Sequence, residues 1–286
     1  MSRSSPGVRR VAAILNFIAD HPGQAFALTD LVRALKLSRA TCHALLTGLV
    51  DVGYLFRTSD KTYVLGPSLA AIGRTAAENF SPLQVAQPEM RMLADEYDVV
   101  CGAYFLEGDT IHLRERAASH SHVGYPVPLG TRMPLRPVNA IAYFARSPKD
   151  CEAWLARTDQ PPDDALLAHM EAGMAFLREH GFVVHLRRPG YEVQEEVHSV
   201  LTRPTAELPV IAASEIDDAQ VYPLVALMAP IYDDKGRVTI SLVMAGFHQP
   251  MSGAQIVEAG GTLRAACERI SRFLAGQPPI APDAAD

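Results

Sequence analysis

The chain has 286 residues, of which 48% are hydrophobic and 20% are charged, and its formal net charge is -6. This length suits two globular domains, and the composition is close to ordinary globular usage. No apolar run approaches the roughly 18 residues of a membrane-spanning helix, and the first ten residues lack the apolar core of a secretion signal. We therefore expect a cytoplasmic protein with no membrane partner.

The charge is divided unevenly along the chain. Residues 1–80 carry nine Lys and Arg against five Asp and Glu, a net +4, whereas residues 81–286 carry 17 against 27, a net -10. A basic front and an acidic remainder indicate that only the front part meets phosphate. The four cysteines lie far apart without a CxxC motif, so we expect reduced structural thiols rather than a zinc ribbon or a disulfide framework. They are Cys42, Cys101, Cys151 and Cys267.

Three helices are predicted in the first 52 residues. Apolar side chains from Val8 to Ile18 recur at helical spacing and should face inward, and Pro22-Gly23 favours a turn after them. We expect Thr29 to cap a second helix, "TDLVRALK", and Ser38 to cap a third.

The third predicted helix has one apolar and one small, polar side. Its apolar side should consist of Cys42, Leu45, Leu46 and Leu49. Its opposite side should expose Ala40, Thr41, His43, Ala44, Thr47 and Gly48, with Arg39 in the leading turn and no acid before Asp51. Short side chains suit a helix that enters a DNA groove about 12 Å wide. The alternating run "GYLFRTSDKTYVLG" then predicts a β-hairpin with Arg57 and Lys61 near its tip.

This order of helices and hairpin predicts a winged helix-turn-helix, which can bind DNA or serve as a protein-protein module. The segments "LVRALKLSRATCHALLTGLVDVGYLFR" and "TYVLGPSLAAIG" resemble the IclR (isocitrate-lyase-regulator) family of bacterial transcription regulators. The resemblance implies a dimer that binds a palindromic double-stranded DNA operator. It places Ser38, Arg39, Thr41, His43 and Thr47 toward the major groove, and Arg57 and Lys61 toward the flanking phosphates.

One position departs from the family pattern. Family members usually have Arg immediately before the Leu-Leu pair, and this chain has Ala44 there. The corresponding contact is therefore missing, or Arg39 or His43 supplies it. His43 itself has two open interpretations, an ordinary solvated side chain or a DNA contact.

The rest of the chain predicts an α+β fold. Two helical patterns flank Ser81-Pro82, strand pairs are expected in "VVCGAYFLEGDTIHLRERA" and across "LVALMAPIYDDKGRVTISLVMAGF", and helices around 150–156, 165–180 and 254–273. We predict an N-terminal winged helix-turn-helix over 1–66, a helical connector over 67–82, an antiparallel sheet flanked by helices over 83–276, and a flexible tail over 277–286. The resemblance implies that the third region is a GAF-like effector-binding domain.

The sequence contains no clear catalytic or metal-binding motif. His120 and His122 could share one side of a strand, but no third ligand has a recognisable spacing, and His185, His198 and His248 are scattered. No GxSxG or glycine-rich phosphate loop occurs. We expect no enzyme activity, cofactor or metal. Two alternatives remain: an enzyme with an accessory winged helix, and a ligand-binding protein whose winged helix contacts protein.

The effector is expected to be apolar. Family members that sense small carboxylates have a "GKA" stretch and pocket serines, but no Gly-Lys follows Pro134-Leu135, and Ala226, Val243 and Ala245 occupy polar positions of those sensors. A buried unpaired carboxylate would cost several kcal/mol. We therefore expect an aromatic, steroid-like or acyl effector of a ligand-responsive repressor, which acts as a dimer or tetramer.

The predicted effector contacts are Met133, Leu135, Ala226, Met228, Val243 and Ala245, with Arg132 or Arg136 as a possible carboxylate anchor at the rim. The alternative is a filled core that binds no ligand.

Overall fold

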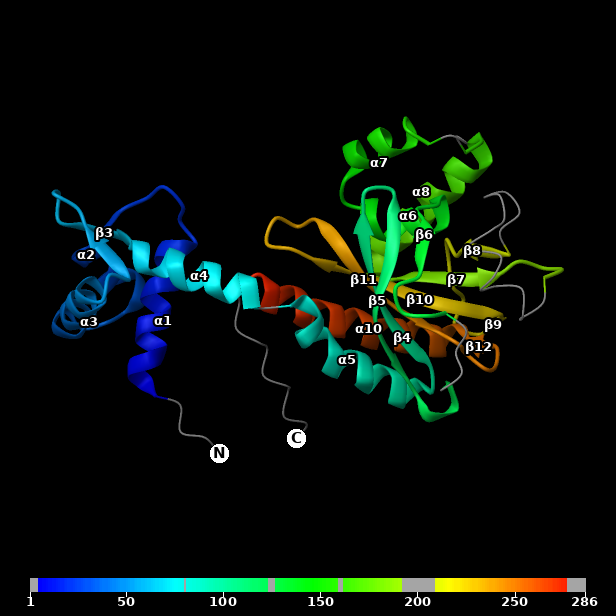
Figure 1. Ribbon diagram of the computed structural model, residues 1–286, viewed down its shortest axis with the longest axis horizontal. Helices are drawn as coiled ribbons and strands as arrows, with labels where there is room; N and C mark the ends of the chain where they lie inside the picture. Colours follow the sequence, from blue (N-terminus) through cyan, green and yellow to red (C-terminus); the bar gives the residue numbers. More distant parts are fainter. Residues whose placement is uncertain (1–4, 80, 123–126, 159–161, 192–208, 277–286) are drawn as a thin grey trace. The chain divides into compact units, whose positions relative to one another are not determined.

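The computed structural model describes residues 5–79, 81–122, 127–158, 162–191 and 209–276, and the chain divides into two compact units, 1–81 and 82–286. The first unit contains the predicted three helices and hairpin in the predicted order (Figure 1). Its elements are α1 (Pro6–Ala19), α2 (Leu28–Leu35), α3 (Arg39–Asp51), β2 (Leu55–Arg57), β3 (Thr62–Leu65) and α4 (Pro67–Asn79). A short strand, β1 (Phe26–Ala27), pairs with β3 and was not predicted because two residues carry no periodic signal.

Helix starts in this unit agree only in part with the predicted caps. The Ser38 hydroxyl accepts a hydrogen bond from the Thr41 amide at 3.1 Å, which confirms Ser38 as the cap of α3. Thr29 does not cap α2, because that helix already begins at Leu28 with Ala27 as its N-cap. The Asp30 carboxylate accepts a hydrogen bond from the Ala27 amide at 2.9 Å and so satisfies a free donor at this helix end.

The core of the first unit is a cluster of apolar side chains from all three helices and the hairpin. Its fully or nearly fully buried members are Ile14, Ile18, Leu31, Cys42, Leu46, Leu49, Leu55 and Tyr63. The inward orientation expected for Val8 is wrong, since this side chain is 68% exposed. Val8 lies in the first turn of α1, before Ile14 and Ile18, which are the buried residues of that helix.

The second unit is built on a seven-stranded antiparallel sheet with the order β6-β5-β4-β11-β10-β7-β8. Its strands are β4 (Val100–Glu107), β5 (Thr110–Ala118), β6 (Arg132–Pro134), β7 (Val183–Arg187), β8 (Val210–Ala212), β10 (Leu224–Tyr232) and β11 (Val238–Ala245). Both predicted strand pairs, β4 with β5 and β10 with β11, are confirmed. A separate two-stranded ribbon pairs β9 (Val221–Tyr222) with β12 (Met251–Ser252).

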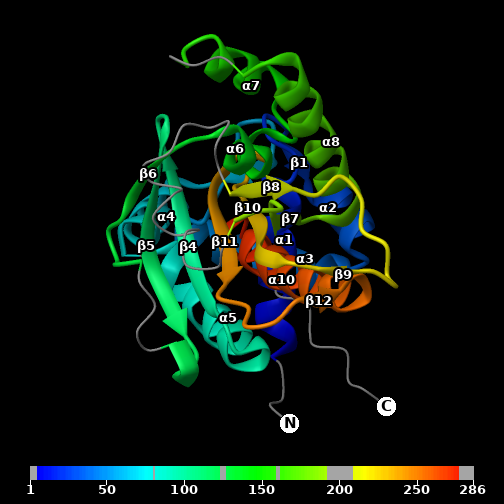
Figure 2. The same cartoon turned by 90° about the vertical axis from the view of Figure 1, so that its right-hand side faces the viewer.

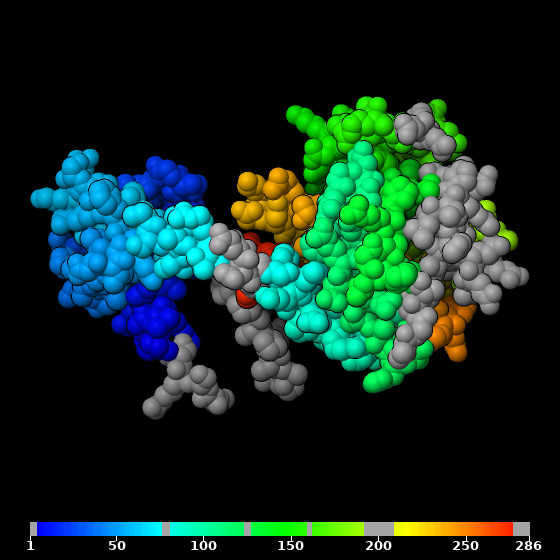
Figure 3. Space-filling model, viewed as in Figure 1, coloured from blue at the N-terminus to red at the C-terminus, as the bar shows by residue number. Residues whose placement is uncertain are grey.

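Helices cover both faces of this sheet (Figures 1 and 2). One face carries α5 (Pro82–Tyr97) and α10 (Gly253–Leu274), and the other carries α6 (Pro137–Phe144) and α8 (Asp164–His180), with α7 (Pro148–Leu155) packed on α6. Alternate residues of the central strands serve the two faces: Leu242 and Met244 join the core under α5 and α10, whereas Val243 packs against the core under α6. The turn between β10 and β11 projects from the unit (Figures 1 and 3).

Helix α6 was not predicted, whereas α7, α8 and α10 lie within a few residues of their predicted spans. The eight residues of α6 are apolar around most of the helix, and so they show no amphipathic period. All four cysteines are free and buried. Among the described residues, no helix is both long and apolar enough to span a bilayer. The tail predicted over 277–286 lies outside the described residues.

Gly66 joins the hairpin to α4 where two backbone segments cross, and this contact generates a stability prediction. A Cβ at residue 66 would lie 2.2 Å from the Gly53 carbonyl oxygen, whereas a Cβ at Gly73 in α4 would meet no atom within 4 Å. Gly66→Ala should destabilise the first unit by about 1–3 kcal/mol. Gly73→Ala should be neutral or stabilising by up to about 1 kcal/mol. Chemical denaturation of the full chain, followed by circular dichroism, measures both, and equal stabilities would contradict the backbone contact.

Candidate nucleic-acid interface and effector pocket

The exposed side of α3 is the one that the sequence predicted. Cys42, Leu46 and Leu49 are buried and Leu45 is half-buried. On the other side, Ala40, His43, Ala44, Thr47 and Gly48 are exposed, with Arg39 exposed in the first turn and Thr41 half-buried. The first acidic residue along the helix is Asp51, its last residue. The exposed side of α3 therefore carries small side chains and no charge along most of its length, and the cationic Arg39 lies in its first turn.

The hydroxyl groups on α3 are partly engaged within the helix. The Ser38 hydroxyl donates to the Thr41 hydroxyl at 2.8 Å, and the Thr47 hydroxyl donates to the His43 carbonyl at 3.0 Å. Ser38 and Thr47 therefore present their oxygens mainly as acceptors while these bonds persist. Arg39 and His43 carry the exposed N–H groups that suit acceptors such as guanine O6 and N7.

The hairpin tip presents two cations on a closed turn. The Thr58 and Thr62 hydroxyl oxygens lie 2.7 Å apart, and the Thr58 amide donates to the Thr62 carbonyl at 2.9 Å. Lys61 is exposed and has a φ of 62° in this turn. Arg57 is also exposed, and its guanidinium carbon lies 5.9 Å from the centre of the Tyr63 ring. Both charges can thus reach a phosphate without unfolding the turn.

Substitution of His43 tests this face of α3. His43→Ala should weaken operator binding by about 1–3 kcal/mol for a base contact and leave unfolding unchanged, because the side chain is exposed and alanine favours helix. Footprinting and gel shift measure the effect, with the exposed α1 substitution Asn16→Ala as a matched control. An unchanged footprint would remove His43 from the interface.

The predicted effector contacts gather under α6 and α8. Leu135 and Met228 belong to the buried core on this face, and Met133 and Val243 pack against it. Met228 pairs with Val243 across β10 and β11, and Ala226 pairs with Ala245 two residues further on the same face. Of the two rim arginines, Arg132 is exposed and Arg136 is half-buried, and burial lowers the pKa of Arg136. Their role in ligand binding stays a prediction.

A buried pair of hydroxyl groups lies on this face and was missed from the sequence. The Tyr143 hydroxyl of α6 lies 2.9 Å from the Ser241 hydroxyl of β11 and donates to the Tyr104 carbonyl at 3.3 Å. Burial raises the pKa of the Tyr143 phenol. Ser241 is two residues before Val243, and so strand alternation could have placed it on the same face. The face is thus largely apolar, and the hydrogen-bonding groups of this pair are satisfied within the protein.

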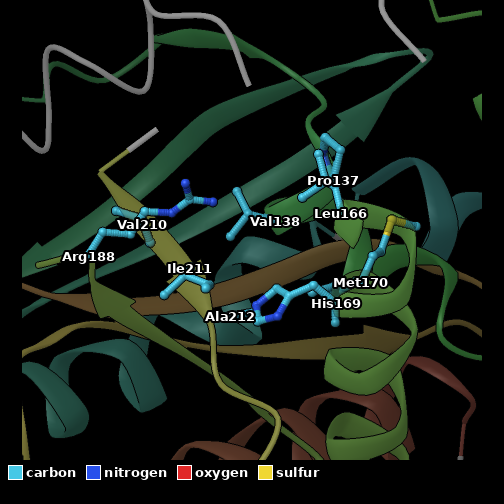
Figure 4. Close-up of a pocket in the computed structure, with 10 residues that line it drawn as sticks. Pro137, Val138, Leu166, His169, Met170, Arg188, Val210, Ile211 and Ala212 are labelled. Atoms are coloured by element: carbon cyan, nitrogen blue, oxygen red, sulfur yellow. The ribbon is translucent and has the colours of Figure 1, made fainter. Parts of the chain in front are cut away.

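A small cavity of about 20 Å³ lies between α6, α8 and β8 (Figure 4). It is lined by Pro137, Val138, Ile141, Leu166, His169, Met170, Arg188, Val210, Ile211 and Ala212, and it shares no residue with the predicted effector contacts. The buried Nε2 atom of His169 has no hydrogen-bond partner among the described residues. This volume accommodates about one water molecule. An effector would therefore require the helices to separate from the sheet here.

His185 joins the sheet to α6 from the same face. It is buried on β7 as the cross-strand neighbour of Ala226, and its Nε2 lies 3.2 Å from the Val138 carbonyl. Burial lowers the pKa of His185 to about 4, and the hydrogen bond to Val138 opposes this shift in part. The neutral imidazole therefore donates to α6 near neutral pH.

The lowered pKa of His185 predicts an acid-dependent loss of stability. The unfolded chain binds a proton at this residue near pH 6.5 and the folded chain only near pH 4. The contribution is therefore complete above about pH 6.5 and is lost as the pH falls toward 4, by up to about 3 kcal/mol. Denaturant unfolding from pH 7 to 4 should show this slope, and His185→Gln should reduce it. An identical slope in the variant would contradict the assignment.

His120 and His122 do not lie on one side of a strand, which is the arrangement that we considered from the sequence. They form a 3₁₀ turn, His120–His122, after β5, and His122 stacks on His248 with ring centroids 4.4 Å apart. Tertiary folding thus brings together two histidines that looked scattered, while His198 lies outside the described residues. No group of three or more His, Cys, Asp or Glu side chains within the described ranges is arranged to bind a metal ion.

Comparison with known proteins supports this reading of the first unit. Residues 7–59 match the sequence model of the IclR helix-turn-helix domain. The chain is 20% identical over 272 residues to the HTH-type transcriptional regulator KipR of Bacillus subtilis (strain 168), over 95% of this chain and 98% of KipR.

Two solved structures share the fold across both units. The repressor BlcR of Agobacterium tumefaciens aligns with a TM-score of 0.67 at 17% identity, over 96% of this chain and 99% of BlcR. HmgR of Pseudomonas aeruginosa aligns with a TM-score of 0.63 at 19% identity, over 95% and 98% of the two chains.

The fold and the exposed α3 define a DNA-binding transcription regulator of the winged helix-turn-helix class. Its first unit contains a helix-turn-helix domain of the IclR type, and its second unit has a helix-flanked antiparallel sheet within the fold that the chain shares with BlcR. This assignment to regulators rather than enzymes rests on the family match.

Proposed function

We propose that this protein is a ligand-responsive cytoplasmic repressor that binds a palindromic operator as a dimer or a dimer of dimers. The observation that carries this proposal is the exposed side of α3, which has small residues and no acid before Asp51. A helix of this kind can approach base edges closely, and a symmetric dimer would present two of them about 34 Å apart to two half-sites.

The proposed DNA contacts divide into base readout and phosphate positioning. Arg39 and His43 can donate to bases in the major groove, and the oxygens of Ser38, Thr41 and Thr47 can accept. At the hairpin, Arg57 and Lys61 would bind the flanking phosphates. Base contacts would determine which operator is bound, and phosphate contacts would supply salt-dependent affinity.

The proposed effector is an apolar, aromatic or acyl molecule bound between the sheet and α6. The six proposed contacts are Met133, Leu135, Ala226, Met228, Val243 and Ala245, all of them buried or half-buried. Burial of an apolar ligand contributes about 25 cal/mol per Å² removed from water. Part of this free energy would be spent in moving α6, which Tyr143 and His185 hold by hydrogen bonds.

The effector would act through the equilibrium between two arrangements of the dimer. A ligand changes DNA affinity only as far as it binds one arrangement more tightly than the other. Separation of α6 from the sheet is the local change that we propose for the bound form. If the filled core never opens, the protein binds DNA without an apolar effector.

A gel shift on the promoter region beside the gene tests the DNA-binding proposal. We expect retention that survives moderate salt and a footprint with two symmetric half-sites, whereas retention lost in mild salt would indicate bulk charge attraction. Calorimetry with hydrophobic acids and neutral apolar molecules, against glyoxylate and pyruvate, tests the effector. Preference for glyoxylate or pyruvate would contradict the apolar pocket.

A further inference from the structure

The second unit contains a larger cavity at one end of its sheet, of about 290 Å³. It lies where β7 and β11 end and β10 begins, and it is close in size to the smallest ligand sites of proteins, about 300 Å³. It is lined by His122, Arg187, Pro223, Leu224, Gly246, Phe247, His248, Gln249 and Pro250. None of these residues lines the 20 Å³ cavity or belongs to the proposed apolar effector contacts.

One wall of this cavity is fixed in place by hydrogen bonds to His122. This side chain is buried, and its Nε2 lies 2.7 Å from the Gly246 carbonyl oxygen, to which it donates. Its Nδ1 can accept from the Ser119 hydroxyl at 2.9 Å, whereas the Ser121 hydroxyl, also 2.9 Å away, donates to Asp98. Hydrogen bonds to Gly246 and Ser119 therefore hold the imidazole orientation. Preorganised groups of this kind bind ligands without a further ordering cost.

His248 extends this wall toward solvent. Its ring stacks on that of His122 with an interplanar angle of 26°, and its side chain is 57% exposed. Asp98, which does not line the cavity, lies behind the two rings, with its Oδ2 3.8 Å from His248 Nε2 and its Oδ1 accepting from the Ser121 hydroxyl. The Asp98 carboxylate thus faces one ring nitrogen of each histidine, at 3.9 Å from His122 Nδ1 and 3.8 Å from His248 Nε2.

The charge of the described lining favours an anion. Arg187 carries a permanent positive charge, His248 and Gln249 add polar N–H groups, and no Asp or Glu is among the described residues of the lining. Guanidinium groups pair with carboxylates through two parallel hydrogen bonds. The remaining walls are apolar, formed by Pro223, Leu224, Phe247 and Pro250.

We propose that this cavity binds a small organic carboxylate with an apolar body. The carboxylate would lie against Arg187 and His248, and the body would contact Leu224 and Phe247. This site is separate from the proposed apolar effector position and does not depend on it. A metal cation is a poor occupant, because it would face the Arg187 charge and the described residues offer no metal-binding group.

Two adjacent arginines provide a matched test, because Arg187 lines this cavity and Arg188 lines the 20 Å³ cavity. Calorimetry on the full chain would use benzoate as the probe and benzamide as its uncharged counterpart. We expect one benzoate per chain and at least tenfold weaker benzamide, a difference of about 1.4 kcal/mol. Arg187→Gln should remove this preference, whereas Arg188→Gln should retain it. His248→Ala should weaken benzoate binding by a smaller factor.

Absence of benzoate binding, or equal affinity for benzoate and benzamide, would overturn the proposal. Loss of the preference in Arg188→Gln with retention in Arg187→Gln would place the site elsewhere and overturn it equally. Thermal unfolding of each variant separates lost binding from lost folding. If Arg187→Gln does not fold, Arg187→Lys and the exposed His248→Ala decide: unchanged benzoate affinity in both would refute the site.

Discussion

The burial of one side of α3 is the constraint on which the DNA-binding surface depends. Cys42, Leu46 and Leu49 pack into a core that includes residues of α1, α2 and the hairpin. Because a helix places residues of opposite phase on opposite sides, this burial fixes which side chains remain outside. Rotation of α3 would expose leucines and bury His43. The same interaction therefore stabilises the unit and orients its recognition surface.

The second unit follows a different principle, since both faces of its sheet are covered. Between Leu227 and Ile231 of β10 and between Ile240 and Met244 of β11, alternate residues belong to the core under α5 and α10, and Met228 and Val243 face the core under α6 and α8. The first core is covered by the long helices α5 and α10. The second core is covered by the shorter α6. This helix is also held to the sheet by hydrogen bonds to Ser241 and His185. The second core lies on the face at which a modest movement can make space for a ligand.

The 20 Å³ and 290 Å³ cavities among the described residues of this unit differ in what they can bind. The 20 Å³ cavity beneath α6 is mainly apolar and closed to anything much larger than water, so that occupancy implies movement. The 290 Å³ cavity has a preformed wall of hydrogen-bonded imidazole and an arginine. The 20 Å³ cavity suits a ligand that shifts a conformational equilibrium. The 290 Å³ cavity suits a ligand that binds with little rearrangement of the protein. Arg187 and Arg188 are adjacent in sequence, at and just after the end of β7, and each lines one of the two cavities.

Local sequence signals determined the helices of the first unit, the α3 cap at Ser38, the exposed face of α3 and the two central strand pairs. Each of these depends on periodicity or on turn and capping residues within a few positions. Short or uniformly apolar segments such as β1, β6, β8 and α6 gave no comparable signal, because pairing and packing with distant residues create them. Only tertiary structure stacked His122 on His248, set Ser241 against Tyr143, and placed the neighbouring Arg187 and Arg188 in separate cavities. Sequence thus fixes which side of an element is apolar, whereas the meeting of polar groups from remote elements is decided by how those apolar sides pack together.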